Sequence, residues 1–253
     1  MTRATFRDMT SLMESVRALT DPIGDLGGMW LLHPDVLGPC RDAGYPNGYA
    51  YYVAGRGGVL GDVDADVITS AFGFFEPSLV RKLWEAGVAV EGARASSARY
   101  TAACCEFSRS RITGFAGTQR LVELAARVAA DVDPTGLALF AGWRAQPQPD
   151  DAAGRAILLM HMLRELRGSV HIVAIVAVGL SAFHAVLASG GEAQAKQFGW
   201  PEPYPLVAAD TKAAAETLTD NILSGLYAAV LTESEAAELA TLAVALREHM
   251  GGH

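Results

Sequence analysis

The chain has 253 residues, a formal net charge of −8, 51% hydrophobic residues and only 19% charged residues. A disordered chain carries far less apolar material, and the length and three cysteines exclude a small disulfide-stapled domain. The acidic balance argues against non-specific nucleic-acid binding, which requires clustered Lys and Arg side chains. These features predict a globular protein with a large hydrophobic core.

Apolar residues at helical spacing predict helices through most of the N-terminal region, residues 1–150. Thr10 is expected to cap the first helix, and Asp21-Pro22 to end it. A Gly- and Pro-rich stretch predicts loops up to a short aromatic element that starts at Tyr49. The helices expected after it are VITSAFGFF, SLVRKLWEAG, residues 94–108, residues 115–131 and LALFAGWR.

The C-terminal region, residues 151–253, opens with a long apolar helix, AAGRAILLMHMLRELRG, which Asp150 or Asp151 can cap. An uncharged run, Ser169–Gly191, follows, and then the proline-rich loop FGWPEPYP and two closing helices. No strand alternation is visible. We therefore expect an all-α multi-helix bundle around a buried apolar helix, with the two regions in one compact unit.

The uncharged run also fits the length of a membrane-spanning helix. It carries polar side chains, among them His171, Ser181 and His184, and charged residues stand directly before it. A core helix surrounded by amphipathic helices explains the same composition, so no membrane is expected. Residues 1–20 contain no apolar signal segment, and the three cysteines lack metal or disulfide spacing, which favours the cytoplasm.

The segment MHMLRELRGSVH carries the strongest candidate chemistry. His161 and Glu165 are four residues apart and share one helix face, with Arg164 and Arg167 beside them. Charged groups in an apolar core helix are costly unless they are paired or used. They therefore indicate either an internal ion-pair network with a hydrogen-bonded histidine, or a site in which His161, Glu165 and His171 are catalytic and the arginines hold an anionic group.

A metal site formed by His161, Glu165 and His171 requires a bend at Gly168. In one straight helix the two histidines would lie about 15 Å apart, too far for a shared ion. The sequence does not identify any other cofactor. Five further residues on or beside loops are candidate walls of a substrate pocket: Tyr49, Trp143, Arg144, Trp200 and Tyr204.

Three blocks together carry a resemblance that covers most of the chain: YVAGRGGVLGDVDADVITSAFGFFEPSLV, LFAGWRAQPQPDD, and LLMHMLRELRGSVH with the following apolar run and FGWPEPYP. In order and spacing they resemble an actinobacterial, helix-turn-helix-related family of helical proteins, exemplified by the SalK-like proteins of natural-product gene clusters. The resemblance implies an all-α fold with a degenerate winged-helix-like part and does not supply a reaction. Gly24 stands where many relatives have histidine.

The residues themselves argue against DNA as a partner. Three prolines in FGWPEPYP leave no room for a recognition helix after the apolar run, and the C-terminal third is acidic. We therefore expect a small-molecule ligand, no nucleic acid and a possible homodimer. The primary hypothesis is an enzyme or accessory protein of specialised metabolism using acid–base or metal-assisted chemistry in a buried pocket. The alternatives are a ligand-sensing winged-helix transcription regulator and a non-catalytic scaffold or dimerisation protein.

Overall fold

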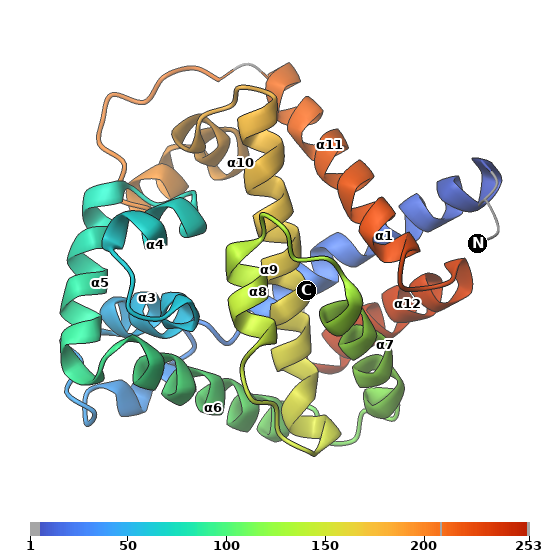
Figure 1. The fold of residues 1–253 in the computed structure, drawn as a ribbon, viewed down its shortest axis with the longest axis horizontal. Coiled ribbons are helices and arrows are strands. Elements are labelled where there is room, and N and C mark those ends of the chain that lie inside the picture. The colour runs from blue at the N-terminus through green and yellow to red at the C-terminus, as the bar shows by residue number, and fades with distance from the viewer. Residues whose placement is uncertain (1–5, 208, 252–253) are drawn as a thin grey trace.

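A computed structural model describes residues 6–207 and 209–251. This part of the chain contains twelve α-helices and two short 3-10 helices, and no strand (Figure 1). The predicted all-α class is confirmed. The helices are α1 (Phe6–Gly28), α2 (Pro34–Leu37), α3 (Gly48–Gly57), α4 (Ala65–Phe72), α5 (Pro77–Glu91), α6 (Ala93–Arg111), α7 (Thr118–Asp131), α8 (Ala138–Arg144), α9 (Ala152–Ala177), α10 (Ala182–Gln197), α11 (Ala209–Ala228) and α12 (Glu233–His249); the 3-10 helices are η1 (Gly38–Cys40) and η2 (Gly58–Leu60).

Helix α9 is the central element, and α1, α6, α7, α8 and α11 pack around it (Figure 1). Residues 156–163 of α9 are all buried, which is the pattern of a helix enclosed by others. Asp151 caps it by accepting a hydrogen bond from the backbone N–H of Gly154 at 2.7 Å. The predicted bundle around a buried helix is confirmed.

The uncharged run does not form one helix. It is divided at the four-residue turn Val178–Ser181, where Gly179 adopts φ +72°, and α9 and α10 meet at 116°. Ser181 caps α10 by accepting from the backbone N–H of His184. A positive φ is unfavourable for side chains other than glycine, so Gly179 places the turn where hydropathy shows only a continuous apolar segment.

The predicted cap of the first helix at Thr10 and its predicted end at Asp21-Pro22 are both wrong, because α1 begins at Phe6 and continues through Pro22 to Gly28. Proline inside a helix costs about 3 kcal/mol. Ile23 and Leu26, directly after it, are 3% and 0% exposed, and α1 packs along α9. Tertiary burial therefore sustains a turn of helix that local preference disfavours.

Two glycines of α1 provide a matched test of this packing. A Cβ at Gly27 would lie 2.7 Å from the Met160 carbonyl oxygen and 2.9 Å from Arg164 Cβ, whereas a Cβ at Gly24 meets nothing within 4 Å. We expect Gly27→Ala to destabilise the fold by about 1–3 kcal/mol, and Gly24→Ala to stabilise it by about 0.5–1 kcal/mol. Urea unfolding measures both. Equal effects would mean that α1 does not approach α9 this closely.

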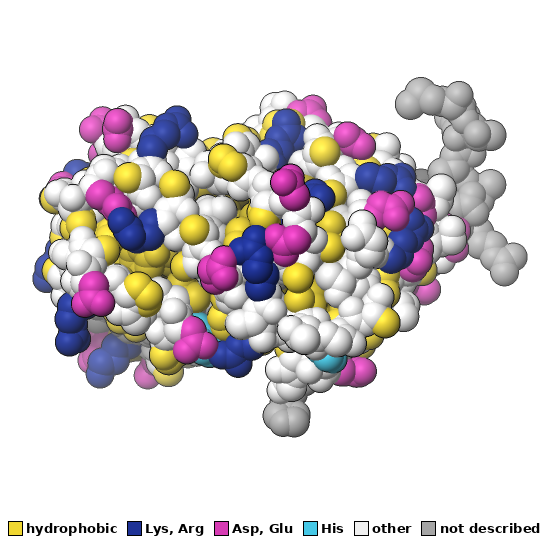
Figure 2. All heavy atoms as spheres, turned by 90° about the horizontal axis from the view of Figure 1, so that it is seen from below, with side chains coloured by type: hydrophobic (Ala, Val, Ile, Leu, Met, Phe, Trp, Pro, Cys, Tyr) yellow, Lys and Arg dark blue, Asp and Glu magenta, His cyan; other side chains and the backbone are white. Residues whose placement is uncertain are grey.

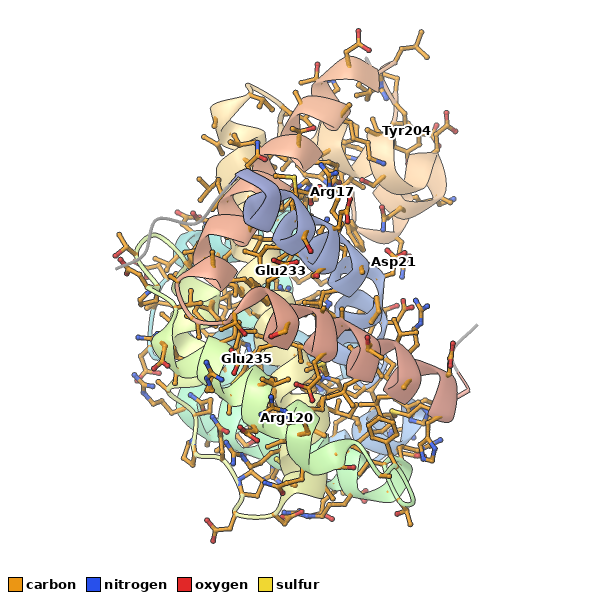
Figure 3. All side chains as sticks on the ribbon, turned by 90° about the vertical axis from the view of Figure 1, so that its right-hand side faces the viewer. Arg17, Asp21, Arg120, Tyr204, Glu233 and Glu235 are labelled. Atoms are coloured by element: carbon orange, nitrogen blue, oxygen red, sulfur yellow. The ribbon has the colours of Figure 1, made fainter. Side chains whose placement is uncertain are left out.

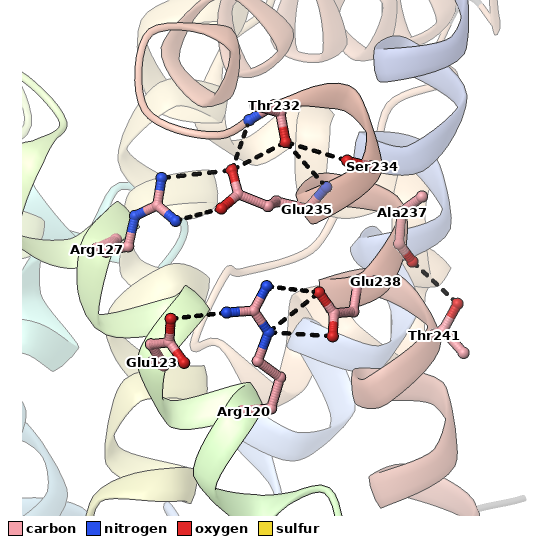
Figure 4. A network of polar contacts seen from close by, with 9 residues as sticks. All are labelled: Arg120, Glu123, Arg127, Thr232, Ser234, Glu235, Ala237, Glu238 and Thr241. Atoms are coloured by element: carbon pink, nitrogen blue, oxygen red, sulfur yellow. Dashed lines mark hydrogen bonds and ion pairs between the residues drawn. The ribbon is translucent and has the colours of Figure 1, made fainter.

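A polar network joins α7 to α12 (Figure 4). Arg120 binds Glu238 through two nitrogens, at 2.7 to 3.1 Å, and Arg127 binds Glu235 at 2.5 Å. Glu235 also completes the N-terminal capping box of α12 with Thr232. These side chains are partly exposed, so the network orients α12 more than it stabilises the fold.

Helix α1 lies across α11 and α12 (Figure 3), where Arg17 donates to Asp220 at 2.8 Å. The face of the molecule seen from below carries basic and acidic side chains close to one another, with hydrophobic side chains between them (Figure 2). Within the described ranges, no single helix has the length and hydropathy of a membrane span; α9 and α10 reach that threshold only when the bent pair is taken together.

Candidate functional site

A cavity of about 1160 Å³ lies among α1, α3, α4, α5, α9, α10 and α11. Its volume is above the 300–1,000 Å³ range of most small-molecule sites. Most of the wall is apolar, and aromatic rings contribute a large part of it. The lining aromatic residues are Tyr49, Tyr52, Phe72, Phe74, Phe75 and Phe198.

Both α9 and α10 contribute to this wall. Arg167 and Gly168 lie three and four residues after Arg164, and His171 lies four and three residues after them, so one face of α9 meets the cavity. Helix α10 contributes Ala185, Val186, Ser189, Gln194 and Gln197. A molecule in the cavity therefore touches both helices on either side of the Val178–Ser181 turn.

A buried ion pair joins the cavity wall to the core: Arg56 lines the cavity, and its partner Glu165 lies behind it. Glu165, which is 1% exposed, accepts from Arg56 Nε at 2.9 Å and from Arg56 Nη2 at 2.8 Å, and Arg56 Nη1 donates to the Tyr52 hydroxyl. Burial by itself raises the pKa of Glu165, but the charge and hydrogen bonds of Arg56, together with His161 and Arg164, outweigh it and lower the pKa to about 2. Glu165 is therefore a permanent anion that holds Arg56 in place.

His161 is enclosed by two tryptophans. Its ring packs edge-to-face on Trp143, 4.3 Å between centroids, and on Trp30 at 5.0 Å. Its Nδ1 lies 3.0 Å from the Gly27 carbonyl oxygen, which accepts a hydrogen bond from the neutral ring, while Nε2 has no partner among the described residues. Burial lowers the pKa of His161 to about 4. The histidine is thus neutral near pH 7.

The structure separates the predicted catalytic group. His161 and Glu165 lie side by side, 3.6 Å apart between Nε2 and Oε1, but neither lines the cavity. His171 does line it, and its Nδ1 lies 2.8 Å from the Thr219 hydroxyl oxygen. The first two residues have the ion-pair and hydrogen-bond roles that were the alternative to catalysis.

The two arginines predicted to bind ligand both reach the cavity. Arg164 Nη1 donates to Glu165 at 3.2 Å, and Arg167 Nη2 donates to Glu216 of α11 at 2.9 Å. His171 Nε2 lies 3.8 Å from the other oxygen of Glu216. Burial lowers the pKa of His171, which favours its neutral form.

Of the five predicted wall residues, only Tyr49 lines the cavity. Trp143 is fully buried against His161, and Arg144 donates to the Val132 carbonyl at the end of α7. Trp200 donates to the Phe74 carbonyl and stacks on Phe183, and Tyr204 donates to the Trp200 carbonyl. These four side chains therefore pack against and hydrogen-bond to other segments of the protein and do not contact the cavity.

The bend required for a metal site is absent: α9 continues through Gly168, so His161 and His171 stay apart along the helix. Across the described ranges, no group of three or more His, Cys, Asp or Glu side chains has the geometry of a metal site. Glycine permits a bend without imposing one, and helices packed along α9 keep it straight.

Sequence reasoning missed several cavity residues: Arg56, Lys82, Glu216 and the aromatic side chains Phe72, Phe74 and Phe75. Arg56 could have been identified from the sequence, because it is the single charged residue in the apolar element YAYYVAGR. A charge within an apolar helix requires a partner, as it did in MHMLRELRGSVH. The partner lies 109 residues away, and only the fold identifies it.

The α9–turn–α10 unit has the geometry of a helix-turn-helix, in which two helices meet at about 90–120° across a short turn that often contains glycine. Residues 16–206 match the sequence profile of a helix-turn-helix family. The chain belongs to this helix-turn-helix family. Searches of curated proteins and of solved structures give no significant match.

Family membership corrects the prediction that nucleic acid is not a partner: a helix-turn-helix protein is expected to bind DNA. Two assumptions caused the error. The prolines of FGWPEPYP exclude a helix only after Gln197, whereas α10, which has a kink at Gly191, lies before them and follows α9 across the short turn. Net charge averages over the whole surface and does not describe the motif, which is defined by backbone geometry.

Proposed function

We propose that this helix-turn-helix protein is a DNA-binding regulator controlled by a small molecule in the cavity. The observation that carries the proposal is the shared wall: α9 and α10, the two helices of the motif, both line the same cavity. A ligand that contacts both can favour one relative position of the helices. Differential affinity for two positions is the physical requirement for such control.

The affinity for DNA is the first test. Selection from a library of randomised duplexes with the full chain is expected to yield a preferred sequence. Lys196 is exposed in the last turn of α10, so Lys196→Gln should reduce the slope of log affinity against log salt by about one. Arg41→Gln, an exposed change outside the motif, is the control. No selected duplex at low salt, or equal slopes for both variants, would contradict the proposal.

Coupling between the cavity and DNA is the second test. Gly168 lines the cavity, and a Cβ there meets no atom within 4 Å, so Gly168→Leu fills part of the space without a clash at Cβ. We expect the affinity for the selected duplex to change by about fivefold or more. An unchanged affinity, with the same unfolding free energy, would show that the cavity does not influence the motif.

The resemblance to SalK-like proteins supports a ligand from specialised metabolism. One observation favours catalysis as a second candidate function: His171 and Glu216 form an imidazole–carboxylate pair at the cavity wall, 3.8 Å between Nε2 and Oε1. The variant His171→Asn distinguishes a regulator from an enzyme. A regulator keeps its ligand bound and unchanged in the wild type, whereas an enzyme converts a bound compound and loses this conversion in the variant.

A further inference from the structure

The charges of the cavity differ in sign from those of the whole chain. Four cationic side chains line it, from α3, α5 and α9: Arg56, Lys82, Arg164 and Arg167. Two carboxylates oppose them, Glu216 in the wall and Glu165 behind it. The chain carries a net charge of −8, yet these four cationic side chains and two carboxylates sum to about +2. Such an excess attracts an anion.

Among the described residues, the two cavity charges without a carboxylate of their own are those of Arg164 on α9 and of Lys82, which is exposed on α5. Arg56 already engages both oxygens of Glu165, so the carboxylate is neutralised before Arg164 adds its 3.2 Å contact. Arg164 is also one-third exposed in a wall where Arg56 is almost fully buried. Its guanidinium has five N–H donors and gives one to protein, which leaves donors for a ligand.

Arg167 lies three residues further along the same face of α9 and is held by Glu216. A guanidinium fixed in this way adds positive potential beside Arg164 without turning away from the cavity. Glu216 in turn limits that potential, since its charge offsets that of Arg167. Glu216 and Arg164 therefore have opposite effects on a bound anion.

The rest of the cavity wall is suited to the apolar part of a ligand. Phe75 and Phe198 are stacked at 4.3 Å between centroids and 29° between planes, and both face the cavity. Phe72, also in the wall, is covered by the Arg56 guanidinium at 4.4 Å. Flat aromatic rings and a volume of about 1160 Å³ suit an extended aromatic or polycyclic compound better than a small polar metabolite.

We infer that the cavity takes an amphiphilic anion, a compound with an acidic group such as a carboxylate on an extended aromatic body, and that Arg164 binds the acidic group. This inference rests on the ligand half of the proposed function and is independent of the DNA half. The aromatic body lies against Phe75 and Phe198. A cationic or strongly polar ligand is disfavoured by the same charges and rings.

Two probes with the same ring system separate charge from hydrophobicity: anionic 1-anilinonaphthalene-8-sulfonate and neutral N-phenyl-1-naphthylamine. Fluorescence titration of the folded wild type is expected to give a Kd at least about tenfold lower for the anion. This preference should diminish with added salt. Equal or tighter binding of the neutral probe would overturn the inference without any variant.

Three variants assign the charge to residues. Arg164→Gln should weaken binding of the anionic probe about tenfold, and Glu216→Gln should strengthen it, both with little effect on the neutral probe. Arg81→Gln is the control, because Arg81 is exposed on α5 and pairs with Asp66 outside the cavity. Gly168→Leu should weaken both probes and so locate them in the cavity. Parallel losses of both probes in Arg164→Gln would overturn the role of Arg164.

The outcomes also separate this inference from the proposed function. Selective anion binding without any selected duplex would leave the ligand class standing and remove DNA regulation. A selected duplex coupled to Gly168→Leu, with no preference for the anionic probe, would keep regulation and reject the ligand class.

Discussion

Replacing Glu165 with alanine is expected to lower the free energy of unfolding by about 3–5 kcal/mol. The change leaves Arg56 buried with its charge uncompensated, since Glu165 is its carboxylate partner and the Arg56 side chain is only 9% exposed. Tyr52 offers a hydroxyl oxygen but no charge. Urea unfolding followed by tryptophan fluorescence measures the loss.

Glu238→Ala is the matched control. Glu238 also binds an arginine, Arg120, through two nitrogens, but these side chains are 42% and 38% exposed. Its removal should cost about 1 kcal/mol or less. The double change Arg56→Met with Glu165→Leu should recover most of the stability, because an apolar pair needs no desolvation of charge. If Glu165→Ala cost no more than Glu238→Ala, the pair would not be buried in solution.

The second large effect is a loss of stability in mild acid that depends on His161. Burial lowers the pKa of His161 from 6.5 to about 4, so the unfolded chain binds a proton in this range and the folded chain does not. The stabilisation is complete above pH 6.5 and is lost as the pH falls towards 4. The difference corresponds to about 3 kcal/mol.

Glu165 affects the free energy of unfolding in a lower pH range than His161 does. Its pKa is lowered from 4.5 to about 2, so its stabilisation is complete above pH 4.5 and is lost only below that. Unfolding free energies measured between pH 6.5 and pH 4.5 therefore report on histidine. His161→Asn retains an N–H donor for the Gly27 carbonyl and does not titrate, so it should reduce the slope of the profile, leaving the contribution of His171, whose pKa burial also lowers. His249→Asn, an exposed change, should retain the slope; the opposite pattern would contradict the burial of His161.

The local signals along the chain predicted many element boundaries. Pro77 begins α5, and Asp151 caps α9. These signals work because a cap or a proline acts through its neighbours in sequence. The errors, at Pro22 and at the Val178–Ser181 turn, are places where packing or a single positive φ outweighs composition.

The candidate site was predictable only in part. The spacing of Arg164, Arg167 and His171 placed them on one face of a helix, and all three line the cavity. The same spacing grouped His161 and Glu165 with them, although both face the core. Periodicity identifies residues that share a face, but it does not reveal which neighbouring helix covers that face.

The sequence by itself determined the all-α class, the central apolar helix and the need for partners around its embedded charges, because propensity, capping and the cost of buried charge are properties of short segments. Tertiary structure alone decided that Arg56 is the partner of Glu165, that α9 and α10 meet at 116°, and that both border one cavity. These relations join residues far apart in the chain, and they depend on how the helices of the described ranges pack around a main core and a smaller cluster formed by α9, α10 and α11.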